Sequence, residues 1–221
     1  MRVLFLGNNW LGWQTLRWLR QQEDEVVGLV LHARERRSHG EEILAAASLP
    51  TERVFLGADL HRAEVREAIR ALRPDIGVSV MFGHLLKKPL LDVFPLGCLN
   101  LHPSLLPYNR GAFPNVWSIL DGTPAGATLH YVDECLDTGD IVAQTQVSVE
   151  PIDTGESLYR KLERAALELF KTAWPAIRMG QAKGRPQDRT AGTFHRKRDI
   201  EPLDEIELDR LYSARELINL L

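Results

Sequence analysis

The chain has 221 residues, of which 44% are hydrophobic and 26% are charged. This composition predicts one globular domain with room for an appendage, and it excludes disordered and fibrous proteins. Lys and Arg number 27 against 30 Asp and Glu, a formal net charge of −3, so no nucleic-acid partner is expected. No apolar run reaches the roughly 18 residues of a membrane helix. The segment after Met1 is too short for a signal-peptide core, so we expect a cytoplasmic protein with no membrane partner.

The two cysteines, Cys98 and Cys135, lie far apart and have no Cys-x-x-Cys spacing or clustered histidine. This pattern argues against a zinc site and against a disulfide framework. We expect both thiols to be buried as small apolar side chains, and we expect no bound metal.

Short apolar runs alternate with helical periodicity through roughly the first hundred residues. Strands are expected at 2–6, 26–31, 54–56, 76–81 and 97–101, and helices at 11–19, 43–47, 61–72 and 85–94. Alternation of this kind is typical of parallel sheets with helical crossovers. The predicted fold is therefore α/β, with a Rossmann-like, mostly parallel sheet flanked by helices.

The pattern changes after Pro124. Two β-rich runs, 125–132 and 141–149, predict a hairpin appended to the sheet, and Thr154 is placed to cap a helix that we expect at the sheet edge. We assign 1–179 to a catalytic domain and 180–221 to a short C-terminal extension, which ends within an apparent helix. Its apolar residues suggest either packing on the core or a homodimer contact: Leu208, Leu211, Leu217, Ile218 and Leu221.

The densest polar cluster spans 100–111, directly after the last predicted parallel strand. Alternation along that strand places Asn100 and His102 on the same side, at the sheet end where ligands of open α/β folds collect. A second cluster at 133–140 is placed to return the Asp137 carboxylate to the same crevice.

Asn, His and Asp on separate turns form a usable catalytic set. An Asn amide can donate to an oxyanion, a His can exchange a proton, and a carboxylate can orient the imidazole. No nucleophile accompanies them, so direct attack of an amine on an acyl donor fits better than an acyl-enzyme. A structural interpretation stands beside this one, because a lone Asn or His at a strand end is more often a turn former or a satisfied core group.

Three other motifs give weaker evidence of function. Asp137-Thr138-Gly139 matches the aspartic proteases, but a single copy in an α/β chain argues against that class. The 7–12 turn opens a helix without the Gly-x-Gly-x-x-Gly pattern, so a dinucleotide site is weakly supported, although the helix start could receive a phosphate or hydroxyls. The basic runs 34–37 and 195–198 are more often solvated faces than nucleic-acid patches; a grip on a substrate phosphate is the alternative.

The segments 100–107, 110–111, 126–130 and 136–140 together resemble the 10-formyltetrahydrofolate-dependent formyltransferases. The resemblance covers the chain from Met1 to about Met179. It implies a Rossmann-like domain and a catalytic triad of Asn100, His102 and Asp137. It also implies that 10-formyltetrahydrofolate is the co-substrate.

The resemblance also implies where folate would lie. The pterin is expected along two segments, mainly through backbone groups. The residues are Met81, Phe82, Gly83, Leu85 and Leu86 in the first segment and Asp133, Glu134 and Cys135 in the second.

The acceptor amine is inferred by comparing members of the family. Methionyl-tRNA formyltransferases carry a sizeable basic C-terminal domain, whereas about forty residues follow Met179 here. Glycinamide ribonucleotide transformylases use a Gly-Asn-Gly-Ser-type first loop, and Trp10 departs from it. The stretch 107–124 and the C-terminal extension most resemble sugar N-formyltransferases, which act on nucleotide-linked amino sugars. The resemblance implies a role in the synthesis of surface polysaccharide such as lipopolysaccharide O-antigen.

Three alternatives stay open: glycinamide ribonucleotide, an aminoacyl carrier substrate, and a folate- or nucleotide-sugar-binding module without catalysis. For the sugar nucleotide, the candidate contacts divide into stacking and polar groups: Trp10 and Tyr108 for stacking, and Asn9, Asn109 and Arg110 for polar contacts.

Overall fold

The computed structural model describes residues 1–188, 190–204, 206–207 and 209–220. The strands are β1 (Arg2–Gly7), β2 (Glu25–Leu31), β3 (Val54–Leu56), β4 (Ile76–Val80), β5 (Cys98–His102), β6 (Arg110–Gly111), β7 (Ala125–Tyr131), β8 (Ile141–Val147) and β9 (Phe194–His195). The α-helices are α1 (Asn9–Leu19), α2 (Gly40–Ala47), α3 (Ala63–Ala71), α4 (Lys88–Leu91), α5 (Pro114–Leu120), α6 (Gly155–Arg178) and α7 (Ala214–Leu220). No helix in these ranges is both long and apolar enough to cross a membrane.

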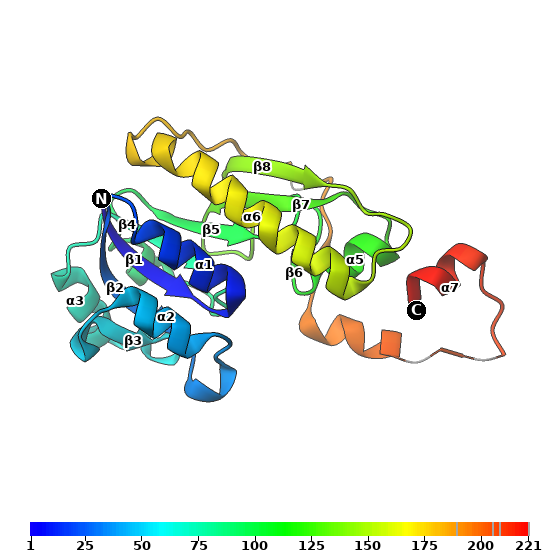
Figure 1. The fold of residues 1–221 in the computed structure, drawn as a ribbon, viewed down its shortest axis with the longest axis horizontal. Helices are drawn as coiled ribbons and strands as arrows, with labels where there is room; N and C mark the ends of the chain where they lie inside the picture. Colours follow the sequence, from blue (N-terminus) through cyan, green and yellow to red (C-terminus); the bar gives the residue numbers. More distant parts are fainter. Residues whose placement is uncertain (189, 205, 208, 221) are drawn as a thin grey trace.

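Seven strands form one twisted sheet in the order β3-β2-β1-β4-β5-β7-β8, which crosses the centre of the molecule (Figure 1). The first five are parallel to their neighbours, and β7 and β8 pair antiparallel at the far side. The chain moves outward from β1 to β3 and then returns to the other side of β1 with β4. The predicted Rossmann-like, mostly parallel sheet with an appended hairpin is confirmed.

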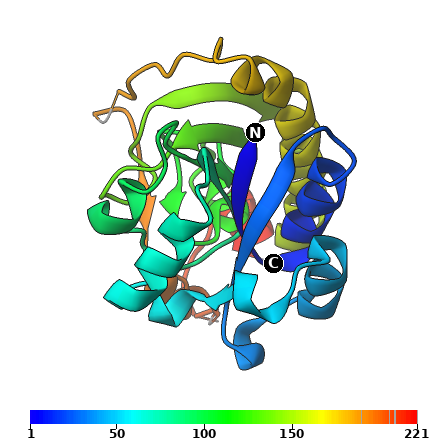
Figure 2. The same cartoon turned by 90° about the vertical axis from the view of Figure 1, so that its left-hand side faces the viewer.

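Alternation along the strands divides the core into two layers. On β1, Val3 and Phe5 face a cluster that includes α1, α2 and α6, whereas Leu4 and Leu6 face a second cluster with α3 and α4. The strands are apolar on both faces because helices cover both sides of the sheet, as expected for a parallel sheet. Figure 2 shows these layers from the side of the N-terminus.

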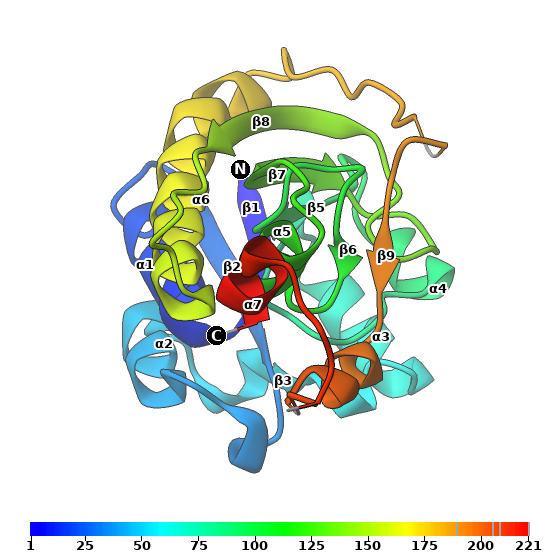
Figure 3. The same ribbon diagram turned by 90° about the vertical axis from the view of Figure 1, so that its right-hand side faces the viewer.

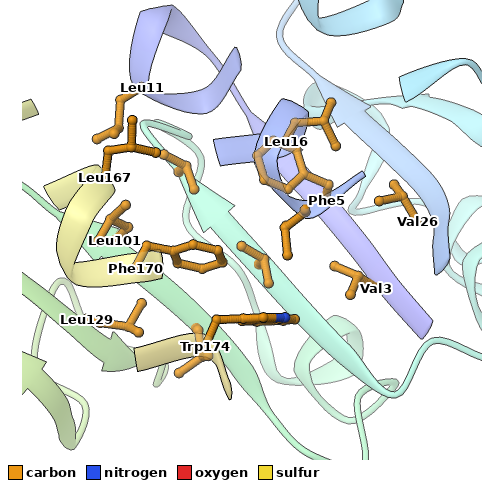
Figure 4. Packing of buried hydrophobic residues seen from close by; sticks show 14 of the residues in the cluster. Val3, Phe5, Leu11, Leu16, Val26, Leu101, Leu129, Leu167, Phe170 and Trp174 are labelled. Carbon is orange, nitrogen blue, oxygen red and sulfur yellow. The ribbon is translucent and has the colours of Figure 1, made fainter. Parts of the chain in front are cut away.

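Helix α6 lies on a face of the sheet, which corrects the expected position at the edge. It contacts β5, β7, β8 and α1, and its inner side chains Phe170 and Trp174 stack with ring centroids 5.1 Å apart (Figure 4). Thr154 caps the helix as predicted, because its hydroxyl accepts from the Ser157 N–H and the Ser157 hydroxyl accepts from the Thr154 N–H. The helix lies on this face because it buries the apolar side chains Leu101 and Leu129, which would otherwise be exposed to water.

The segment after α6 packs back onto the rest of the chain. Strand β9 pairs with β6, and α7 packs near α5, where the Asn219 side chain donates to the Ile119 carbonyl (Figure 3). Leu211 and Ile218 are exposed, while Leu208 and Leu221 lie outside the described residues. The extension is therefore held at two places on the domain, one of them beside the predicted catalytic residues.

Candidate active site

Two neighbouring strands present a polar patch on the face of the sheet opposite α6. Leu99 and Leu101 of β5 belong to the α6-side core, so Asn100 and His102 point the other way, as alternation predicts. Antiparallel pairing places His130 directly opposite Asn100 and Thr128 opposite His102.

The loop between β7 and β8 folds back over this face and brings Asp137 onto the patch. Its Oδ1 lies 3.5 Å from the Asn100 Nδ2 and 3.7 Å from the His130 Nε2, and its Oδ2 lies 3.7 Å from the His102 Nε2. The carboxylate also accepts a 2.9 Å hydrogen bond from the Gly111 N–H. The structure thus brings the three predicted catalytic residues into one cluster, with Asp137 buried at its centre.

Local contacts explain why this loop folds back. The Asp133 carboxylate accepts from the Cys135 N–H and from the Thr138 hydroxyl, which closes a tight turn. Gly139 passes so close to the sheet that a Cβ there would lie 1.9 Å from the Tyr131 carbonyl oxygen. Cys135 stands exposed at the tip of this turn, which corrects the expectation that both thiols are buried; Cys98 is buried as expected.

His102 lies between two acceptors. Its Nε2 is 3.4 Å from the Asn109 carbonyl oxygen and 3.7 Å from the Asp137 Oδ2. We therefore assign the proton of the neutral ring to Nε2, which leaves Nδ1 with a free lone pair. A ring held in this tautomer can accept a proton at Nδ1 while Asp137 stabilises the charge that forms.

His130 belongs to the same cluster and was not among the predicted site residues. Its Nδ1 lies 2.8 Å from the Tyr131 carbonyl oxygen, and its Nε2 lies 3.1 Å from the Asn100 amide nitrogen. Burial lowers the pKa of His130, and nearby Asp137 opposes this shift. A neutral ring with the proton on Nδ1 fits both contacts. The sequence could have indicated His130, because an antiparallel pairing of β7 with β5 places this polar residue opposite Asn100.

The first expected folate segment follows β4. Met81 adopts a left-handed backbone (φ 54°), and the side chains of Phe82 and Leu86 are buried in the second core. Those two side chains anchor the loop, so Gly83, the exposed Leu85 and the backbone form its accessible surface. In the second segment Asp133 is half-buried, and Glu134 and Cys135 are exposed.

The predicted substrate contacts do not form one group. Asn9 and Trp10 start α1, where Trp10 is partly buried against the core and the Asn9 side chain donates to the Tyr159 hydroxyl. Tyr108 and Arg110 are half-buried and flank Asn109, whose carbonyl oxygen lies 3.4 Å from the His102 Nε2.

The structure corrects the predicted role of the Asn109 side chain as a substrate contact. It is 0% exposed, and its amide nitrogen donates to the hydroxyls of Ser118 and Thr123. Its side chain is therefore occupied within the protein, and its carbonyl group is the part that faces the site.

The start of α1 carries a carboxyl group of the chain itself. Glu163 of α6 accepts from the Leu11 backbone N–H and contacts the Tyr159 hydroxyl, and burial raises the pKa of this carboxyl. The place at which a phosphate would meet the helix N-terminus is thus filled by Glu163, which disfavours the phosphate role considered for the 7–12 turn.

Comparisons with known proteins identify the family of the chain. The formyl transferase family model matches residues 1–173. Methionyl-tRNA formyltransferase from Geotalea daltonii is 34% identical over 194 residues, which cover 85% of this chain and 62% of that protein. The chain therefore spans less than two thirds of that relative's length.

Two solved structures align with the entire chain. One is a 4-N formyltransferase from Francisella tularensis, at 25% identity and a TM-score of 0.81, with 86% of that chain covered. The other is a formyltransferase from Anoxybacillus kamchatkensis in complex with UDP-4,6-dideoxy-4-formamido-L-AltNAc and tetrahydrofolate, at 26% identity and a TM-score of 0.68, with 98% of that chain covered. The predicted resemblance is confirmed, and the chain belongs to the formyl transferase family.

Proposed function

We propose that the protein is an N-formyltransferase that moves the formyl group of 10-formyltetrahydrofolate to the amine of a nucleotide-linked amino-deoxy sugar, a step of surface polysaccharide synthesis. The observation that carries the proposal is that Asn100, His102 and Asp137 lie together on one face of the sheet. The Asp137 carboxylate lies 3.5 Å from the Asn100 amide nitrogen and 3.7 Å from the His102 Nε2, so an amide donor, a base and a buried carboxylate adjoin one another. This set supplies what direct amine attack on a formyl carbon requires, and it lacks a nucleophile of its own.

Each residue has a role in the transfer. The substrate amine forms a C–N bond with the formyl carbon, the bond from that carbon to N10 of the folate breaks, and one proton passes from the amine to N10. Asn100 donates an amide hydrogen to the carbonyl oxygen as negative charge develops there. His102 takes and returns the proton through Nδ1, and Asp137 stabilises its charged form.

Asn100 is arranged so that one of its two amide hydrogens is available. The contact with His130 is a normal 3.1 Å hydrogen bond, whereas the contact with Asp137 is 3.5 Å long. The hydrogen on the long contact is the one that a substrate oxygen displaces at small cost. His130 then acts as the anchor that keeps the amide aimed at the formyl group.

Folate would lie between the two segments after β4 and β7. Gly83 and Leu85 offer exposed backbone and apolar surface on one side, and the Asp133–Cys135 turn offers backbone groups on the other. Both segments adjoin the face that carries Asn100, because β4 pairs with β5. The formyl group would thereby reach the cluster while the pterin remains over the loops.

Basic side chains support a phosphate-bearing acceptor. Burial is the main cause that lowers the pKa of His32 to about 4, followed by the neighbouring His84 and by the positive charges of Arg36, Lys197 and Arg37. Arg36 follows β2, so these charges lie on the same carboxyl edge of the sheet as the catalytic cluster. A nucleoside diphosphate carries negative charge, which can pair with these positive side chains.

A second candidate acceptor is charged initiator tRNA, which the methionyl-tRNA formyltransferase relative favours by sequence identity. The net charge of −3 opposes it. Glycinamide ribonucleotide is disfavoured by Glu163 at the start of α1. An aminoacyl carrier substrate and a binding module without catalysis complete the alternatives. A binding module would not need the cluster of Asn100, His102 and Asp137.

The deciding experiment is mass spectrometry of the protein with 10-formyltetrahydrofolate and a panel of amines: nucleotide-linked 4-amino-4,6-dideoxyhexoses, glycinamide ribonucleotide and charged initiator tRNA. A formyl mass increase on a sugar nucleotide, lost in Asn100→Ala and His102→Ala, is the expected result. Formylation of tRNA alone would transfer the assignment to the second candidate. Full activity of either variant would overturn the mechanism.

A further inference from the structure

The segment 192–195 lies outside the residues that the family model matches, yet it borders the catalytic cluster. Strand β9 runs parallel to β6, with the Arg110 N–H donating to the Thr193 carbonyl at 3.1 Å and the Ala112 N–H donating to the His195 carbonyl at 2.9 Å. Gly111, between them, donates to Asp137. The backbone that holds the Asp137 carboxylate is therefore itself held by the C-terminal extension.

The Thr193 side chain makes a second, more specific connection. Its hydroxyl accepts from the Asn109 N–H at 2.7 Å and donates to the Asn109 Oδ1 at 2.9 Å. With Ser118 and Thr123 on the amide nitrogen, every polar group of the Asn109 side chain has a partner. Asn109 is thus fixed on three sides.

This fixation matters because Asn109 has a left-handed backbone (φ 54°), a conformation that costs free energy and persists when the surroundings enforce it. The peptide carbonyl that follows is the acceptor 3.4 Å from the His102 Nε2. Together with Asp137 Oδ2, that carbonyl favours the tautomer with the proton on Nε2, in which Nδ1 is the acceptor.

We propose that Thr193 is a positioning residue of the active site, whose hydroxyl fixes Asn109 so that the Asn109 carbonyl holds His102 in its working tautomer. The proposal rests on the proposed formyl transfer for its kinetic consequence. Its structural consequence, the state of the His102 ring, is independent of the substrate. The C-terminal extension is accordingly a part of the catalytic centre.

The test uses two substitutions at one position. Thr193→Val keeps the shape and removes the hydroxyl, and Thr193→Ser keeps the hydroxyl. Thr190→Val is the matched control, because Thr190 is exposed in the same segment and its hydroxyl bonds Asp188. We expect Thr193→Val to lower kcat roughly 10- to 100-fold, with each KM within about twofold, because small misplacements of catalytic groups have effects of this size. Thr193→Ser and Thr190→Val should stay within about threefold of the parent protein.

A substrate-independent measurement accompanies the kinetics. The 15N shifts of the His102 ring should show the Nε2–H tautomer in the parent protein and a mixture in Thr193→Val, with circular dichroism confirming that each variant is folded. Equal losses in Thr193→Val and Thr193→Ser, an effect on KM alone, or an unchanged His102 spectrum in Thr193→Val would each overturn the proposal. If no amine is formylated, the proposed function fails, and the His102 spectra still decide the positioning role.

Discussion

The amide nitrogen of Asn100 lies 3.1 Å from the Nε2 of His130, directly across the pairing of β5 and β7. The imidazole is buried, burial lowers its pKa, and its other nitrogen lies 2.8 Å from the Tyr131 carbonyl oxygen. His130 therefore presents a lone pair to the Asn100 amide in a direction that the strand pairing sets, and it fixes the Asn100 side chain.

The first prediction concerns this anchor. His130→Phe removes the acceptor and leaves an Asn100 hydrogen without a partner, so the amide can rotate away from the formyl group. We expect kcat to fall roughly 10- to 100-fold with little change in KM for folate, somewhat less than the loss of an oxyanion donor outright. Steady-state kinetics measure the effect. His61→Phe, at an exposed position away from the cluster, is the control, and parent-like kinetics for His130→Phe would contradict the anchor role.

A second prediction concerns the carboxylate. Asp137→Asn keeps the shape, but one of its two carboxylate oxygens becomes an NH2 group that faces either the Gly111 N–H or the Asn100 amide, both of which are donors. The charge that stabilises protonated His102 is lost as well, and we expect kcat to fall at least about 100-fold. Asp140→Asn alters an exposed carboxylate in the same loop and should leave kcat within about twofold. Comparable losses in both variants would point to the loop fold rather than to the Asp137 charge.

The third prediction tests how Asp137 is delivered. Gly139→Ala would place a Cβ 1.9 Å from the Tyr131 carbonyl oxygen, so the loop must lift from the sheet and carry Asp137 away from His102. We expect kcat to fall more than 10-fold and the free energy of unfolding to fall by about 1–3 kcal/mol. Gly155→Ala, where a Cβ meets ordinary contacts at 3.5 Å, is the control. An active Gly139→Ala protein would show that the close approach is not needed.

Much of the architecture follows from local patterns. Strands β1 to β5 read as short apolar runs because helices cover both of their faces, and alternation alone placed Asn100 and His102 on one side of β5. The start of helix α6 after Thr154 was predicted. Its position on the sheet could not be predicted, because periodicity and capping fix where a helix starts and not which sheet face it covers.

The missed parts of the site depend on contacts distant in sequence. Thr193 and Asn109 are 84 residues apart, and no sequence motif around either residue predicts that they form a hydrogen bond. Asn109 was predicted to contact the substrate. In the folded chain its side chain instead forms hydrogen bonds with Ser118, Thr123 and Thr193. His130 was within reach of prediction, because a hairpin register that pairs Leu101 with Leu129 also pairs Asn100 with His130.

The last prediction concerns pH. Burial and nearby positive charge lower the pKa of His32 to about 4 from 6.5, and the Gly83 N–H donates to its Nε2 at 3.2 Å, which requires the neutral ring. Between pH 6.5 and 4 the unfolded chain binds a proton at His32 that the folded protein does not, so the free energy of unfolding falls as pH falls through this window and levels off below pH 4. We expect His32 to account for about 1–3 kcal/mol of that loss. Urea unfolding at several pH values should show a shallower dependence for His32→Gln, which retains an acceptor for Gly83, whereas His61→Gln should follow the parent curve. Parallel curves for His32→Gln and the parent protein would mean that the folded protein does not hold the His32 imidazole neutral across this pH window.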